Sequence, residues 1–261
     1  MLLDKATSFN KQTLRIISLV PSQTELLYHL GLEEEVAGIT KFCIHPDAWH
    51  KAKPRIGGTK NINISKIKNL SPTLIIANKE ENVKEQITLL AHEYDVWVTD
   101  VNNLQDALQM IKDIGVLTQK EIKAQQITQS ILQKFEQLHP HPILKKAIYL
   151  IWKNPFMTIG GDTFISNMML YAGFKNVFDT NTRYPTITVE DIRKSGTEYL
   201  LLSTEPYPFS QQHVNELQAQ LPHIKVILVD GEMFSWYGSR LLIAADYFEK
   251  MKKTDFHVEP K

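Results

Sequence analysis

The stretch Asn63-Ile-Ser-Lys-Ile-Lys-Asn-Leu-Ser-Pro-Thr-Leu-Ile-Ile-Ala-Asn-Lys-Glu80 decides the fold, because its pattern returns without a gap later in the chain. The second copy reads Thr188-Val-Glu-Asp-Ile-Arg-Lys-Ser-Gly-Thr-Glu-Tyr-Leu-Leu-Leu-Ser-Thr-Glu205. Each copy begins with a good helix-capping residue and ends in an apolar strand with a polar end. Two copies of one helix–turn–strand unit predict two similar α/β lobes. Because clefts between domains are preferred ligand sites, we expect a ligand cleft between the lobes.

The rest of the chain alternates between apolar runs and segments of helical periodicity. We expect buried strands at 14–20, 36–40, 74–77, 96–99, 146–152 and 225–229. We expect helices at 22–30, 83–92, 104–114, 163–172 and 210–220, and a last one from residue 239. Ser22 and Glu25 have the spacing of a capping box, and the segment 41–60 reads as a loop. This alternation predicts the α/β class, with two Rossmann-like lobes built on parallel sheets.

A long helix is predicted between the two copies of the repeat. Gly115 interrupts the helix before it, and Thr118 with Glu121 has the spacing of a second capping box. The new helix runs to about Leu138, which spans roughly 30 Å, and its polar content suits a helix laid across two lobes. We therefore predict an N-terminal lobe at 1–114, a linking helix at 115–140 and a C-terminal lobe at 141–261.

Composition excludes some classes of function. Lysine plus arginine equals aspartate plus glutamate at 29 each, so the formal net charge is zero, which argues against a broad nucleic-acid surface. Cys43 is the only cysteine, so no internal disulfide can form. No stretch approaches the roughly 20 apolar residues of a membrane span, and Met1–Asn10 shows no signal-peptide run. The compartment therefore stays open at this point.

Several short motifs resemble the helical-backbone family of ABC-importer substrate-binding proteins, the metal-chelate receptors, and among these the cobalamin-binding members most closely. The resemblance covers about Leu14 to Phe248. It is carried by Arg15-Ile-Ile-Ser-Leu-Val-Pro-Ser-Gln-Thr-Glu25, Pro54-Arg-Ile-Gly-Gly58, Leu70-Ser-Pro-Thr-Leu-Ile-Ile76 and Gly160-Gly-Asp-Thr-Phe164. It implies two α/β lobes bridged by one long helix, with the ligand held between them.

The resemblance also implies a function. The chain would hold a metal chelate, such as a corrinoid, haem or a ferric siderophore, and deliver it to an ABC-transporter permease. It would be no enzyme, would have no cofactor of its own, and would act as a periplasmic or cell-surface monomer. The alternative is a cytoplasmic chelate-binding or chelate-processing protein that reuses the fold, since fold does not determine function.

In this family the ligand contacts loops at the strand ends of both lobes. The resemblance places these loops at 41–45, 59–61, 152–157, 183–185 and 234–240. Aromatic residues there offer rigid contact area to a flat macrocycle, and cations there can meet carboxylates. The predicted ligand-binding residues are Lys41, Phe42, Cys43, His45, Thr59, Lys60, Trp152, Phe156, Tyr184, Phe234, Trp236, Tyr237 and Arg240.

Two further expectations concern a metal and the permease. Cys43 and His45 lie two residues apart and would share a face if extended, so either could be an axial ligand to iron or cobalt; the other reading is a packed cysteine and a loop histidine. Family members dock on their permease through one carboxylate per lobe. The matching positions here are Glu190 and Ser65, and Ser65 departs from the pattern because it cannot form a salt bridge.

Overall fold

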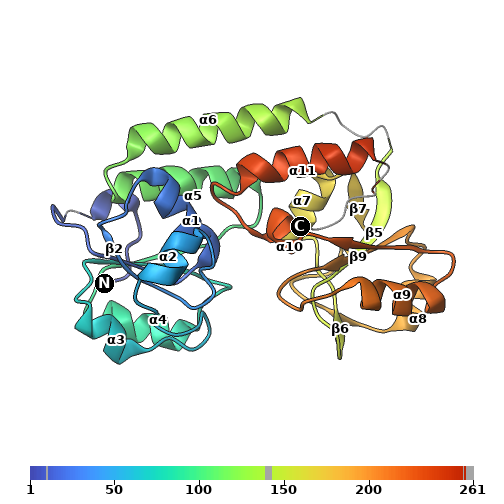
Figure 1. Cartoon of the computed structure of the whole chain (residues 1–261), viewed down its shortest axis with the longest axis horizontal. Helices are drawn as coiled ribbons and strands as arrows, with labels where there is room; N and C mark the ends of the chain where they lie inside the picture. The colour runs from blue at the N-terminus through green and yellow to red at the C-terminus, as the bar shows by residue number, and fades with distance from the viewer. Residues whose placement is uncertain (10, 139–142, 255, 257–261) are drawn as a thin grey trace. The chain divides into compact units, whose positions relative to one another are not determined.

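A computed structural model describes residues 1–9, 11–138, 143–254 and 256 of the chain (Figure 1). The chain divides into two compact units, each with its own sheet. Unit 1 comprises Met1–Val101, Gln105–Ser130 and Tyr237–Arg240. Unit 2 comprises Asn102–Leu104, Ile131–Trp236 and Leu241–Lys261. The end of the predicted linking segment, at residue 140, lies outside the described residues.

Unit 1 is a four-stranded parallel sheet in the order β2-β1-β3-β4. Its strands are β1 Ile16–Ser18, β2 Val36–Ile39, β3 Leu74–Asn78 and β4 Val96–Thr99. Its helices are η1 Ala6–Ser8, α1 Pro21–Leu30, α2 Asp47–Ala52, α3 Ile64–Asn69, α4 Lys84–Ala91 and α5 Leu104–Leu117, the last of which enters unit 1 at Gln105. Alternate strand residues pack on α3 and α4, so this face of the sheet is a continuous apolar core.

Unit 2 repeats this plan with a parallel sheet in the order β10-β9-β5-β7. Its strands are β5 Lys145–Leu150, β7 Phe174–Asn176, β9 Tyr199–Ser203 and β10 Lys225–Val229, beside a small antiparallel pair of β6 Phe156–Met157 and β8 Thr186–Ile187. Its helices are α7 Phe164–Tyr171, α8 Val189–Lys194, α9 Gln211–Gln220, α10 Gly231–Ser235 and α11 Leu241–Lys253. One face packs on α8 and α9. The predicted two-lobed α/β fold with parallel sheets is confirmed.

The two copies of the sequence repeat fold in the same register. The first forms α3 and β3, and the second forms α8 and β9. Asn63 and Thr188 cap their helices, each accepting a hydrogen bond from the backbone N–H three residues on. In each sheet the repeated strand lies beside the first strand of the unit. The internal repeat therefore positions one interior strand of each sheet.

The helix α6, Glu121–Gln137, is shared by both units, because its residues to Ser130 belong to unit 1 and the rest to unit 2. Two local predictions before it are wrong. Gly115 does not break α5; a Cβ there would lie 2.5 Å from the Cβ of Ala124, so glycine lets α5 and α6 approach closely. Thr118 is no cap, because its hydroxyl donates to the Ile114 carbonyl at the end of α5.

The predicted capping box at the start of α1 is also wrong. The helix begins at Pro21, which is favoured at a first helical position, and Ser22 already lies inside it. Glu25 instead pairs with Arg240, whose Nη2 lies 2.7 Å from one carboxylate oxygen.

The predicted loop at 41–60 contains the short helix α2, which buries Trp49 against the rest of unit 1. Its indole N–H donates to the Glu33 carboxylate at 3.0 Å.

Candidate ligand-binding site

Polar side chains gather where the parallel strands of unit 1 end. The Thr24 hydroxyl donates to the Ser18 hydroxyl at 2.7 Å and lies 3.0 Å from the Cys43 sulfur. The Thr40 hydroxyl lies 3.2 Å from the same sulfur. Because open α/β sheets bind ligands beyond the carboxyl ends of their strands, this edge is the candidate ligand surface of unit 1.

Phe42 and Lys41 form the exposed part of this surface. The Phe42 side chain is 50% exposed, and the Lys41 ammonium lies 4.9 Å from the centre of its ring. Gly58 lies close to the same ring, because a Cβ there would come within 3.2 Å of it. Thr59 is buried, and the Lys60 ammonium donates to the Glu80 carbonyl. Phe42 is therefore an exposed aromatic ring with the Lys41 cation beside it.

The structure places Cys43 in the core. Burial raises the pKa of the Cys43 thiol, and the hydrogen bonds to Thr24 and Thr40 only partly oppose this shift. The thiolate is the form that binds metals, so a raised pKa does not favour Cys43 as an axial ligand. His45 keeps part of its surface exposed, unlike its neighbour. Across the described part of the chain, no group of three or more His, Cys, Asp or Glu could hold a metal ion.

Trp152 is the exposed aromatic residue of unit 2 at the strand ends. It lies two residues after the end of β5, its side chain is 41% exposed, and its ring packs edge-on against Tyr207 with 5.6 Å between centroids. The Trp152 carbonyl accepts from Met157, and Ile151 donates to the Met157 carbonyl, so the turn between β5 and β6 is closed by its own backbone. Phe156 is half-buried against the core of unit 2. Tyr207, whose ring packs against the indole, was not among the predicted contacts.

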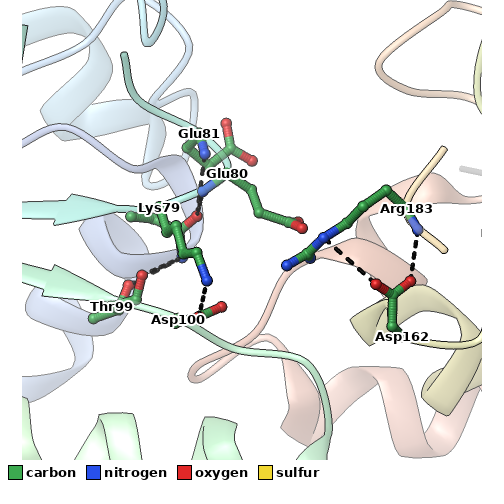
Figure 2. Close-up of polar contacts among 8 residues, drawn as sticks. Lys79, Glu80, Glu81, Thr99, Asp100, Asp162 and Arg183 are labelled. Atoms are coloured by element: carbon green, nitrogen blue, oxygen red, sulfur yellow. Dashed lines mark hydrogen bonds and ion pairs between the residues drawn. The ribbon is translucent and has the colours of Figure 1, made fainter. Parts of the chain in front are cut away.

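Arg183 lies in a loop held by Asp162. The Asp162 carboxylate accepts from the Arg183 backbone N–H at 2.6 Å and lies 3.5 Å from its Nε (Figure 2). The Arg183 backbone has a φ of 56°, which residues other than glycine rarely adopt. The Gly160 N–H donates to the Arg183 carbonyl at 2.7 Å. Asp162 therefore fixes this loop instead of capping α7, whose cap is Thr163.

The predicted contacts near the start of α11 are largely buried. Phe234 is fully buried between Tyr149 and Phe248. The Trp236 indole N–H donates to the Glu205 carboxylate at 2.8 Å. These surroundings assign Phe234 and Trp236 to the packing of unit 2.

Tyr237 and Arg240 belong to unit 1 and are 7% exposed each. The Arg240 guanidinium forms a two-point ion pair with Glu25, through Nε at 2.9 Å and Nη2 at 2.7 Å. Arg240, a predicted ligand contact, thus has an internal partner in unit 1. The other predicted contact, Tyr184, is half-buried in unit 2 beside Arg183.

The two predicted docking positions are exposed on short helices. Ser65 lies on α3 and Glu190 on α8, at matching positions of the repeat. The Glu190 carboxylate lies 3.3 Å from both Arg193 and Lys194 on its own helix.

A hollow beside β4 and α5 contains acidic side chains that already have partners, since Lys79 pairs with Asp100. We do not assign a ligand to that hollow.

A family model described as a periplasmic binding protein matches residues 16–221. The chain belongs to this family. The predicted role as a substrate-binding protein is therefore confirmed, and the family is one of binding proteins rather than enzymes. No helix among the described residues is both long and apolar enough to cross a membrane.

Two relatives of this periplasmic binding protein share most of its length at low identity. The vitamin B12-binding protein of Pectobacterium atrosepticum is 25% identical over 241 residues, covering 88% of this chain and 85% of the relative. A Bacillus subtilis ABC transporter substrate-binding lipoprotein, named as uncharacterized, is 24% identical over 250 residues, covering 90% of this chain and 78% of the relative.

Solved structures show the same fold. The apo periplasmic heme-binding protein of Roseiflexus has a TM-score of 0.79 at 17% identity, covering 94% of this chain and 100% of that one. The periplasmic vitamin B12-binding protein of Vibrio cholerae has a TM-score of 0.72 at 19% identity, covering 92% of this chain and 96% of that one. At these identities the likeness concerns the fold alone.

Proposed function

We propose that this protein binds a metal chelate outside the cytoplasm and delivers it to an ABC-transporter permease. The observation that carries the proposal is the pair of exposed aromatic side chains, Phe42 and Trp152, at the strand ends of a substrate-binding protein. Large aromatic surfaces are normally buried, and flat ligands bind well on them. Relatives with the same fold carry the names vitamin B12-binding and heme-binding protein, and both ligands are flat macrocycles.

Exposed cations in the predicted ligand loops suit the polar rim of such a ligand. Lys41 and Lys60 are exposed in unit 1, and Arg183 is exposed in unit 2. Asp162 holds the Arg183 loop in one conformation, so little ordering is needed when a ligand binds. We propose that the ligand contacts Lys41, Phe42, Lys60, Trp152, Phe156 and Tyr184, and that Arg183 meets an acidic or carbonyl group on its rim.

The permease is the proposed protein partner. Glu190 lies exposed on α8, where a carboxylate can reach an arginine of another protein. A chelate-processing role would instead require a reactive Cys43 or His45. The burial of the Cys43 thiol works against this alternative.

A tryptophan-fluorescence titration tests the proposal. Purified protein is titrated with cyanocobalamin, haemin and a set of ferric siderophores. We expect saturable quenching by one of them, with most of the amplitude lost in Trp152→Phe. Trp49→Phe is the matched control, because Trp49 is buried on α2 and hydrogen-bonded to Glu33. If no chelate quenches the wild-type protein, or if Trp152→Phe leaves both amplitude and affinity unchanged, the proposed function or its site is wrong.

A further inference from the structure

Glu81 follows β3 at the ligand-facing edge of unit 1 and was not among the predicted contacts. Its neighbours in the chain are held rigidly. The Asn78 side-chain oxygen accepts from the backbone N–H groups of Glu80 at 2.8 Å and Glu81 at 3.1 Å. The Asn78 amide also donates to the Thr99 carbonyl at the end of β4. The backbone that carries Glu81 is therefore fixed to two strands.

Asn82 attaches the same loop to the Phe42 surface. Its buried amide donates to the Leu19 carbonyl at 3.3 Å and to the Thr59 carbonyl at 3.1 Å. Its oxygen accepts from the Asn78 N–H at 2.9 Å. Thr59 follows Gly58, the residue that lies against the Phe42 ring. The loop that carries Glu81 and the exposed aromatic ring thus share one rigid support.

The Glu81 carboxylate, unlike its backbone, is left without a partner. Among the described residues the carboxylate has no hydrogen bond and no ion pair, and Figure 2 draws polar contacts to the Glu81 backbone only. Burial raises the pKa of Glu81, the Lys60 charge opposes this shift, and the Glu80 charge adds to it. A partly buried carboxylate without a donor is unfavourable for folding. Groups of this kind, mounted rigidly at a binding surface, are typical of functional sites.

We propose that Glu81 is a specificity-determining ligand contact, and that its carboxylate accepts a hydrogen bond from a donor group of the bound chelate, such as an amide or a hydroxyl. The inference rests on the proposed function and adds a selection rule to it. Cyanocobalamin carries primary amides on its rim, which can donate to Glu81. Haemin carries carboxylates, which a second carboxylate repels. Glu81 therefore favours amide- or hydroxyl-bearing chelates over those with carboxylates alone.

The test compares Glu81→Gln with the wild-type protein in two measurements. Glutamine keeps the shape and one acceptor oxygen but removes the charge. In the ligand-free protein we expect Glu81→Gln to melt at a higher temperature, because the charge that burial disfavours is gone. For cyanocobalamin we expect affinity to fall about fivefold, the difference between a charged and a neutral acceptor. Haemin affinity should not fall. Glu85→Gln, on the exposed first turn of α4, is the matched control for both measurements.

The outcomes separate the two proposals. If the wild-type protein binds none of the chelates, the proposed function is wrong and the role of Glu81 falls with it. If the wild-type protein binds cyanocobalamin and Glu81→Gln binds it equally well, only the role of Glu81 is wrong. A lower melting temperature in Glu81→Gln would give the residue a structural role and overturn the inference. Binding of haemin alone, unaffected by the substitution, would overturn the selection rule.

Discussion

The Glu25–Arg240 ion pair offers the sharpest test of how unit 1 is held together. The two residues are 215 positions apart in sequence, and their side chains are 11% and 7% exposed. Two hydrogen bonds of 2.9 and 2.7 Å join them. The same segment is attached by the Ser239 hydroxyl, which lies 2.9 Å from His29 Nδ1. The ion pair therefore holds the segment Tyr237–Arg240 against α1.

Replacing one partner leaves the other charge buried and unpaired. Arg240→Met keeps much of the side-chain length and removes the charge, so the Glu25 carboxylate loses both donors. Breaking a buried pair in this way costs about 3–5 kcal/mol. For a chain of this size that corresponds to a fall in Tm on the order of 10 °C. The double variant Glu25→Leu/Arg240→Met should recover most of the loss, because an apolar pair avoids the unpaired charge.

Urea and thermal unfolding followed by circular dichroism measure these differences. Lys51→Met is the control, because Lys51 pairs with Asp47 at 2.5 Å while both side chains are more than 70% exposed. Exposed pairs of this kind contribute about 0.5 kcal/mol or less. If Arg240→Met costs no more than the control, or if the double variant is as unstable as the sum of its single changes, the reasoning about this ion pair is refuted. If Arg240→Met loses ligand binding without losing stability, Arg240 contacts the ligand.

Four other predictions follow from the described contacts. The pKa of Glu81 is raised in the folded protein, so the free energy of unfolding should fall as the pH rises from the pKa of Glu81 in the unfolded chain through its pKa in the folded protein. Glu81→Gln should remove this contribution to the pH dependence of stability; an unchanged pH dependence would contradict the prediction. The Cys43 thiol should resist iodoacetamide until urea unfolds the protein, because it is buried and its pKa is raised; rapid alkylation of native protein would contradict its placement. Thr188→Ala removes the cap of α8 and should lower unfolding free energy by about 1 kcal/mol, read from the urea midpoint; no change would mean that the cap contributes nothing. Gly161→Ala should lower the Tm more than Gly196→Ala, because a Cβ at Gly161 would lie 2.1 Å from the Asp179 carbonyl oxygen. A Cβ at Gly196 would meet no atom, so the only cost there is backbone strain at a φ of 68°. A larger fall in Tm for Gly196→Ala would disprove this.

Local patterns predicted most of the secondary structure. The repeat placed α3 with β3 and α8 with β9, because capping residues and apolar runs act over a few residues. The strand at Val96–Thr99 lies where its β-branched run predicted it. Short elements were missed, among them α2, because a helix of six residues within a proline-containing segment carries little periodic signal.

The capping predictions show where local reasoning ends. Ser22 and Thr118 have the right spacing to begin helices, and neither does so. Pro21 starts α1 one residue earlier, and the Thr118 hydroxyl has a nearer acceptor at the end of α5. Spacing identifies candidates for a hydrogen bond, and the competing acceptors in the folded chain decide among them.

By itself, the sequence determined the two α/β lobes, the parallel sheets and the family resemblance, because these depend on periodicity and short motifs. Only the tertiary structure decided which of the candidate side chains are exposed and which are buried. Phe42 and Trp152 are exposed, whereas Phe234 and Arg240 are buried, although all four are predicted contacts. The physical reason is that burial is set by neighbours from distant parts of the chain, as when Glu25 neutralises an arginine 215 residues away.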